Sequence, residues 1–220
     1  MYGYVQEGRQ GAIEMRQIAG MWFCTLTLPV GGSFLGLRRR RWWRKLQSAG
    51  VRRAVLPAHL TAEGVRWGIE PVEVYTLRRA LLPKLLDRCP SLSGKSVRLA
   101  APYVTAAVVA AAEVLARRAR YVDLQVGRGG EALAAHLQRR YGLAVGAVGT
   151  VALTVDFGSG SLGRCIYLGE DCAARQQVMY HVEKLASVGV EAQEQLLSAL
   201  FGAGYLEKEE IQVKTIRFNA

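Results

Sequence analysis

The chain has 220 residues, half of them apolar, and a formal net charge of +11. This length suits one large or two small domains with a buried core, and the apolar content excludes disorder over most of the chain. Residues 1–120 hold 20 Lys/Arg against 7 Asp/Glu, whereas residues 121–220 hold 9 against 11. The basic first half favours an anionic partner: nucleic acid, an acidic protein or a membrane surface. The 23 Arg against 6 Lys also fit the codon bias of a GC-rich genome.

The cysteines show no Cys-x-x-Cys spacing and lie far from the three histidines: they are Cys24, Cys89, Cys165 and Cys172. No metal site is therefore expected, and free thiols in a reducing, cytoplasmic compartment are the simplest interpretation. The first residues lack the order of a signal peptide. The most apolar stretch, residues 99–116, is too short and too weakly hydrophobic for a membrane span, so it predicts a buried helix.

Hydrophobic periodicity and turn residues divide the first half into short elements. In chain order we expect a loose N-terminal arm over 1–20, a strand over 21–28, a helix over 33–49, a strand over 51–56, an irregular segment over 58–74 and a helix over 76–88. Ser33 and Gly50 suit the two ends of the first helix. Pro83 predicts a kink in the second helix.

The second half repeats the alternation of strands and helices. Strands are expected over 96–100, 120–126, 150–157, 164–168 and 210–218, and helices over 102–118, 129–141, 173–186 and 190–201. After the arm, residues 21–220 are interpreted as a single α/β domain, with a possible seam between two halves near 89–95.

Alternating strands and helices imply βαβ units, which require parallel strands. The expected fold class is therefore α/β: one mostly parallel, doubly wound, Rossmann-like sheet with helices on both faces. Strands 21–28, 51–56, 96–100, 120–126 and 150–157 are expected to share that sheet. In this rhythm, residues 21–168 resemble the nucleotide-binding α/β superfamily. Folds of this kind bind ligands at the carboxyl ends of their strands.

One turn between a predicted strand and a predicted helix combines glycines with a cation: Gly127, Arg128, Gly129 and Gly130. Backbone N–H groups at a helix start have no partner inside the helix, and Arg128 adds positive charge, so this turn is a candidate anion site. The alternative is a tight structural turn whose helix dipole Glu131 already satisfies.

Two carboxylates complete the candidate ligand site. Asp123 alternates onto one face of its strand with Tyr121 and Gln125, and a buried carboxylate requires a partner. Asp156 lies near the carboxyl end of another strand. These residues either line a cleft together with the glycine turn, or Asp123 forms a structural ion pair with a cation such as Arg120 or Arg140.

A second glycine motif, Gly158-x-Gly160-x-x-Gly163, also follows a predicted strand. A dinucleotide-binding motif of this spacing must open a helix, whereas residues 164–168 predict a strand. We therefore interpret this motif as a loop.

Residues 38–45 form a basic run that contains two tryptophans. On a helix, Leu35, Trp42 and Leu46 share a stripe that is expected to dock on the sheet. The candidate nucleic-acid contacts, expected to be weak and nonspecific, are Arg38, Arg41, Arg44 and Lys45. Aromatic residues among cations suit nucleic acid or anionic lipid, but a solvated helix face has the same composition.

The sequence leads to two functional hypotheses. The first is a Rossmann-like domain that binds a small anionic ligand, for example a nucleotide, at the carboxyl edge of its sheet. The second is a basic module that contacts nucleic acid or an acidic partner through residues 38–45. No catalytic residue or cofactor can be assigned from the sequence, and whether the protein is an enzyme stays open.

Overall fold

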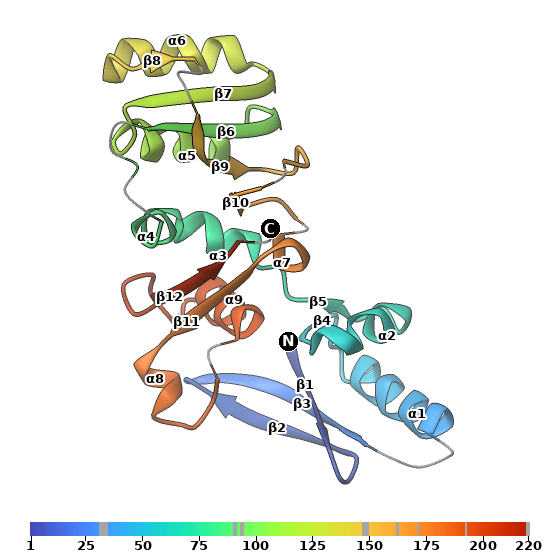
Figure 1. Ribbon diagram of the computed structural model, residues 1–220. Helices are drawn as coiled ribbons and strands as arrows, with labels where there is room; N and C mark the ends of the chain where they lie inside the picture. Colours follow the sequence, from blue (N-terminus) through green and yellow to red (C-terminus); the bar gives the residue numbers. More distant parts are fainter. Residues whose placement is uncertain are drawn as a thin grey trace. The chain divides into compact units, whose positions relative to one another are not determined.

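A computed structural model of the chain describes residues 1–30, 35–89, 92, 95–146, 150–161, 163–170, 172–191 and 193–218, and for residues 35–38, 144, 173 and 174 it describes the backbone alone. The chain forms two compact units (Figure 1), each described here by itself. Unit 1 comprises Met1–Glu73 and Val182–Ile211, and unit 2 comprises Val74–His181 and Gln212–Ala220. This division differs from the expected single domain over 21–220 and from the expected seam near 89–95.

Unit 1 contains a five-stranded sheet in the order β2-β3-β1-β4-β5. Its strands are β1 (Tyr2–Gly8), β2 (Ala12–Ile18), β3 (Met21–Pro29), β4 (Arg53–Val55) and β5 (Glu70–Pro71). Neighbours pair in parallel except β2, which is antiparallel to β3. Residues 1–20, expected to form a loose arm, thus provide two strands, and β1 lies at the centre. Gly3 permits this position because a Cβ there would lie 2.9 Å from Val51 Cγ1.

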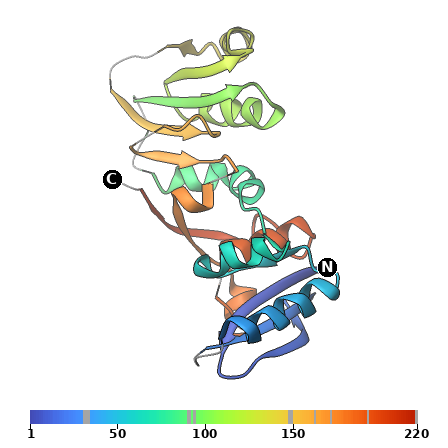
Figure 2. The ribbon, with the colours of Figure 1, turned by 90° about the vertical axis from the view of Figure 1, so that its right-hand side faces the viewer.

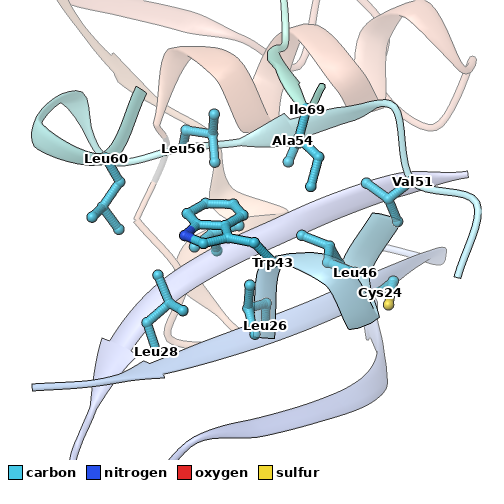
Figure 3. Close-up of a cluster of buried hydrophobic side chains, with 11 residues drawn as sticks. Cys24, Leu26, Leu28, Trp43, Leu46, Val51, Ala54, Leu56, Leu60 and Ile69 are labelled. Atoms are coloured by element: carbon cyan, nitrogen blue, oxygen red, sulfur yellow. The ribbon is translucent and has the colours of Figure 1, made fainter. Parts of the chain in front are cut away.

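The helical elements of unit 1 are α1 (Leu35–Ser48), the short 3-10 helix η1 (Ala58–Leu60), α2 (Thr61–Arg66), α8 (Glu183–Ala186) and α9 (Glu194–Gly202). Figure 3 shows the core beneath α1, where Trp43 and Leu46 pack with Leu26 and Leu28 of β3. Both α1 side chains are fully buried. The expected docking stripe of Leu35, Trp42 and Leu46 is therefore corrected: Trp43, three residues before Leu46 on the same helix face, takes the buried position. Trp42 is only partly buried, and the Leu35 side chain lies outside the described residues.

The segment 182–211 belongs to unit 1 because α9 satisfies backbone groups of the N-terminal segment. Gln195 Oε1 accepts a hydrogen bond from the Leu56 N–H at 2.7 Å. The Ser198 hydroxyl donates to the Glu73 carbonyl at 2.6 Å. The expected helix over 190–201 is thus a shorter α9 that is bound to a segment far earlier in the chain.

Unit 2 contains a fully parallel five-stranded sheet in the order β10-β9-β6-β7-β8. Its strands are β6 (Ser96–Tyr103), β7 (Tyr121–Arg128), β8 (Ala144–Val145), β9 (Val151–Asp156) and β10 (Cys165–Tyr167). The prediction that strands 21–28 and 51–56 share one sheet with these strands is wrong. They pair in unit 1 because β1, at the N-terminus, lies between β3 and β4 and holds them together.

The two faces of the unit 2 sheet differ in polarity. Helices α5 (Ala106–Ala116) and α6 (Gly130–Tyr141) follow β6 and β7 and lie on the same side of the sheet (Figure 2). The fully buried positions Val97, Leu99 and Val122 share one face by register. The opposite face carries polar side chains, including Arg98 and its register partner Asp123.

The remaining elements of unit 2 are α3 (Tyr75–Ala80), α4 (Leu82–Asp87), α7 (Cys172–Arg175), β11 (Gln177–His181) and β12 (Gln212–Arg217). The helix expected over 76–88 breaks at Leu81. Pro83 lies in the first turn of α4, where the missing N–H of proline costs no hydrogen bond within the helix. The expected helix over 173–186 is wrong. Its centre is β11, which pairs antiparallel with β12 in a two-stranded sheet.

Arg78 of α3 is fully buried and joins α3 to the segment that follows β10. Its guanidinium donates to the carbonyl oxygens of Cys172 at 2.8 Å and of Gln176 at 2.7 Å, with a longer contact to that of Tyr167. A buried cation with several carbonyl acceptors fixes the local backbone, because losing these bonds would leave buried polar groups with fewer partners.

Candidate functional site

A pocket of about 310 Å³ opens at the carboxyl ends of β6 and β9 in unit 2. Its lining comes from α3, the end of β6, the turn after it, the first turn of α5 and the loops after β9 and β10: Tyr75, Arg79, Pro102, Tyr103, Thr105, Ala106, Ala107, Val108, Phe157 and Glu170. A smaller cavity of about 90 Å³ shares Arg79, Ala107 and Phe157 and is otherwise lined mainly by aliphatic side chains. The site therefore combines an open pocket that has polar side chains with a smaller, mainly apolar cavity beside it.

Arg79 is held in the pocket wall by two aromatic rings. Its guanidinium carbon lies 4.5 Å from the ring centroid of Tyr75 and 5.3 Å from that of Phe157. Its Nε donates to the Leu168 carbonyl at 3.0 Å. Such cation–π contacts orient the planar guanidinium group of Arg79 without neutralising its charge. The two Nη atoms of Arg79 make no hydrogen bond to the described residues, so they are the donors available to a ligand.

The first turn of α5 forms another part of the wall. Thr105 caps the helix, and its hydroxyl accepts a hydrogen bond from the Val108 N–H at 3.2 Å. The preceding amides, of Ala106 and Ala107, have no acceptor within the helix and carry the positive end of its dipole. Glu170 adds a carboxylate to the same lining. The pocket thus offers donors for an anion and one acceptor for a hydroxyl or amine.

Asp156, a predicted site residue, organises the loop beside the pocket. Its carboxylate is fully buried and accepts from the N–H groups of Gly158, Ser159 and Ser161 and from the Ser159 hydroxyl, at 2.6–2.9 Å. Burial acts to raise the pKa of Asp156, but these hydrogen bonds outweigh it and hold the pKa below its ordinary value. Gly158 and Gly160 adopt positive φ angles of 100° and 81° in this loop. Asp156 thereby positions Phe157, which does line the pocket.

Asp123, the second predicted carboxylate, forms an ion pair within the sheet. Arg98 Nε lies 2.7 Å from Asp123 Oδ2, across the β6–β7 register. The partner therefore differs from both cations considered from sequence: the Arg120 guanidinium lies 5.4 Å from the Tyr121 ring centroid, and Arg140 pairs with Glu113 at 2.8 Å. Adjacent parallel strands bring residues of the same register together, which places Arg98 directly beside Asp123.

The Gly127–Gly130 turn has structural reasons for its glycines. A Cβ at Gly127 would lie 2.3 Å from the Pro102 carbonyl oxygen, so the two strands can approach only without a side chain there. Gly129 is the N-cap of α6 with φ of 89°, a conformation that favours glycine. Arg128 is exposed. None of the six predicted ligand residues lines the pocket, which lies one strand away at the β6–α5 turn.

The sequence does indicate a helix start at the β6–α5 turn, although this turn has none of the glycines found at the β7–α6 turn. Chain order runs outward from β6 in both directions, through β7 and β8 on one side and through β9 and β10 on the other. The segment Pro102–Ala106 lacks glycines, so it does not match a phosphate-binding motif. Thr105 ahead of an apolar run nevertheless marks a capped helix start at that position.

The basic run lies on α1 of unit 1. Arg41, Arg44 and Lys45 are exposed, as is Arg40. The Arg38 side chain lies outside the described residues. Arg39 is different, because it pairs with Glu7 at 2.6 Å and with Glu63 at 3.3 Å.

Three further features concern the described residues. They contain no group of three His, Cys, Asp or Glu side chains suited to a metal ion. None of their helices combines the length and apolarity that crossing a membrane needs. The four cysteines are free thiols, and burial raises the pKa of Cys165 to about 12, so this thiol is unreactive at neutral pH.

Comparisons with protein-family models, with curated proteins and with solved structures found no match.

Proposed function

We propose that unit 2 is a Rossmann-like α/β domain that binds a small anionic ligand of the nucleotide class in the pocket at β6 and β9. The observation that carries this proposal is the position of the pocket. Open α/β sheets bind ligands outside the carboxyl ends of the strands, at the point where the strand order reverses. Counted from β6, the order of the unit 2 sheet is 3-2-1-4-5, which reverses between β6 and β9.

The charges of unit 2 support an anionic ligand. Its residues include 16 Lys/Arg against 7 Asp/Glu, a formal charge of +9. Within the pocket, Arg79 and the first turn of α5 both favour negative charge. A helix terminus contributes only about 0.3–1 kcal/mol, whereas micromolar affinity needs about 8 kcal/mol. Arg79 and the apolar walls must therefore supply most of the binding energy.

The other side chains of the pocket support a nucleotide over a bare phosphate. Tyr103 is 57% exposed at the opening, and an aromatic ring there offers a stacking surface for a base. Glu170 offers an acceptor for a ribose hydroxyl, the role that acidic residues have in dinucleotide sites. The volume of about 310 Å³ lies at the lower end of the range for ligand pockets, which favours a mononucleotide.

The test is calorimetric titration of the protein with adenosine monophosphate, adenosine diphosphate and inorganic phosphate. The informative variant is Ala106→Glu, which puts a carboxylate in the first turn of α5 and in the pocket lining. This substitution strengthens the helix N-terminus by about 0.3–1 kcal/mol, so lost binding does not follow from unfolding. We expect a nucleotide to bind more tightly than phosphate, and Ala106→Glu to weaken it at least tenfold.

The matched control is Ala132→Glu, an exposed position in the first turn of α6 outside the pocket. It should leave the affinity unchanged. A second pair, Arg79→Gln and Arg128→Gln, separates this pocket from the Gly127–Gly130 turn. The proposal fails if no probe binds, or if Ala132→Glu and Arg128→Gln weaken binding as much as the pocket variants.

A further inference from the structure

The outward side of α1 in unit 1 carries an unusual concentration of positive charge. Arg40, Arg41, Arg44 and Lys45, with Ser48, line a shallow depression of about 510 Å³; these five residues are named here the basic face. All five are exposed. Their spacing of one, three and four residues along a helix puts them on one continuous side of α1.

The charge of the basic face is not neutralised within the described part of the molecule. Arg39, on the same helix, is held by Glu7 and Glu63 and is thereby neutralised. For the four cations of the basic face, no ion pair with a described residue is recorded. Unit 1 as a whole carries only +2, with 13 Lys/Arg against 11 Asp/Glu, so the concentration of charge on α1 is local.

Two tryptophans lie beneath these cations. The guanidinium carbons of Arg40 and Arg44 lie 5.6 and 5.8 Å from the ring centroid of Trp67, and Lys45 Nζ lies 4.6 Å from that of Trp42. Both indoles are only partly buried. A cation that moves from a ring to a phosphate therefore uncovers an aromatic surface next to that phosphate.

The described apolar side chains of α1 argue against insertion of this helix into a bilayer. Trp43 and Leu46 are fully buried in the core of unit 1 (Figure 3). A membrane-surface helix needs its apolar side chains free to enter the acyl region. Among the described side chains of α1, those outside the core are polar apart from the partly buried Trp42, which favours a hydrated polyanion as the partner.

From this arrangement we propose that the basic face binds single-stranded nucleic acid, with phosphates in the depression and unpaired bases stacked on Trp67 and Trp42. Positive grooves bordered by aromatic side chains are the usual surface for single strands, because any base can stack on them. A duplex keeps its bases stacked internally and gains nothing from the indoles. This proposal concerns unit 1 and is independent of the pocket in unit 2.

The test measures fluorescence anisotropy of a labelled oligothymidylate with the full chain. Four phosphate contacts predict a log–log salt slope of about −2.8 for a single strand, which is about a fiftyfold loss of affinity between about 50 and 200 mM salt. Binding should also quench tryptophan fluorescence. Trp67→Leu leaves the charge unchanged but removes a stacking surface, so it should reduce the affinity as well. The variant with Arg40, Arg41, Arg44 and Lys45 all changed to Gln should lose at least tenfold in affinity.

The matched control changes four exposed arginines elsewhere to Gln: Arg9, Arg52, Arg120 and Arg139. It removes the same charge and should retain nearly full affinity. Equal loss in both variants would overturn the proposal in favour of net-charge attraction. A duplex bound as tightly as the single strand, binding to anionic phosphatidylserine vesicles in place of the oligonucleotide, or no binding at low salt would each overturn it as well.

Discussion

The two units carry their positive charge in different ways. Unit 2 is basic throughout, at +9, whereas unit 1 has a formal charge of only +2 and concentrates its cations on α1. The charges of residues 1–120 and 121–220 do not show this difference, because segment 182–211, with six acidic residues, folds as part of unit 1. Charge asymmetry along a chain therefore indicates a partner only after the residues are assigned to the unit in which they fold.

The units also differ in what holds them together, and tryptophan fluorescence separates them experimentally. All four tryptophans, at positions 22, 42, 43 and 67, belong to unit 1. The core of unit 1 is built around one indole, whereas unit 2 depends on a buried guanidinium and on close contact between strands. The following substitutions address these differences, beginning with the largest expected effect.

Trp43→Ala should destabilise unit 1 by about 3–5 kcal/mol, because it removes a fully buried indole from the core. Trp42→Ala, at the neighbouring position, should cost much less because Trp42 is only partly buried. Urea unfolding followed by circular dichroism measures both variants. Equal losses of stability would contradict the assignment of Trp43 as the buried residue.

Arg78→Met should destabilise unit 2 by about 2–3 kcal/mol or more, because the buried carbonyls of Cys172 and Gln176 lose their hydrogen bonds from the guanidinium. The exposed Arg88→Met serves as the control. If the units unfold independently, the transition followed by circular dichroism shifts and the one followed by tryptophan fluorescence does not. A shift of both by the same amount would show that the two units unfold as one.

Gly127→Ala should cost about 1–3 kcal/mol in unit 2, because the new Cβ would meet the backbone carbonyl of Pro102, which can give way only if β6 moves. Gly202→Ala in unit 1 is the opposite case. Its Cβ enters open space in α9, and the better helix propensity of alanine adds up to about 1 kcal/mol of stability. Thermal unfolding of the two variants compares them, and a neutral Gly127→Ala would contradict the close strand contact.

Asp156→Asn should produce a pH-dependent loss of stability. The pKa of Asp156 is lowered in the folded protein, so its carboxylate stabilises the fold above the unfolded pKa and loses that contribution as the pH falls through the folded value. The variant should therefore be less stable than the native chain near neutral pH, and the difference should shrink in acid. A stability difference that is constant from neutral to acidic pH would contradict this role.

Local patterns were sufficient for many elements, because their signals lie within a few residues. Gly50, with φ of 80°, follows the end of α1 as a C-terminal glycine should, and Gly142, with φ of 62°, ends α6 in the same way. Partners distant in sequence were not predictable. β11 is a strand because β12, some thirty residues later, pairs with it, although residues 173–186 suggest a helix on their own.

Only part of the candidate site could be predicted from the sequence, because residues distant along the chain form it together. A pocket lies at the carboxyl edge of the parallel sheet, where a ligand site was predicted, but its lining residues differ from the predicted ones and the ligand site stays a prediction. Tyr75 and Arg79 reach the pocket from a helix that precedes the sheet, and Glu170 from a loop after β10. At the predicted Gly127–Gly130 turn, Gly127 leaves space for the carbonyl of Pro102 on the neighbouring strand, and the anion site at this turn stays a prediction.

The order in which the two units are completed has a consequence for biosynthesis. The chain leaves unit 1 after Glu73 and returns at Val182, so unit 1 waits for its last segment while the intervening residues are translated. At about 5–20 residues per second this interval lasts about 5–20 s. Throughout it, the Leu56 N–H and the Glu73 carbonyl lack the partners that α9 later provides. Nascent chains arrested before residue 182 should therefore be cut by protease within residues 1–73 much faster than the released full-length chain.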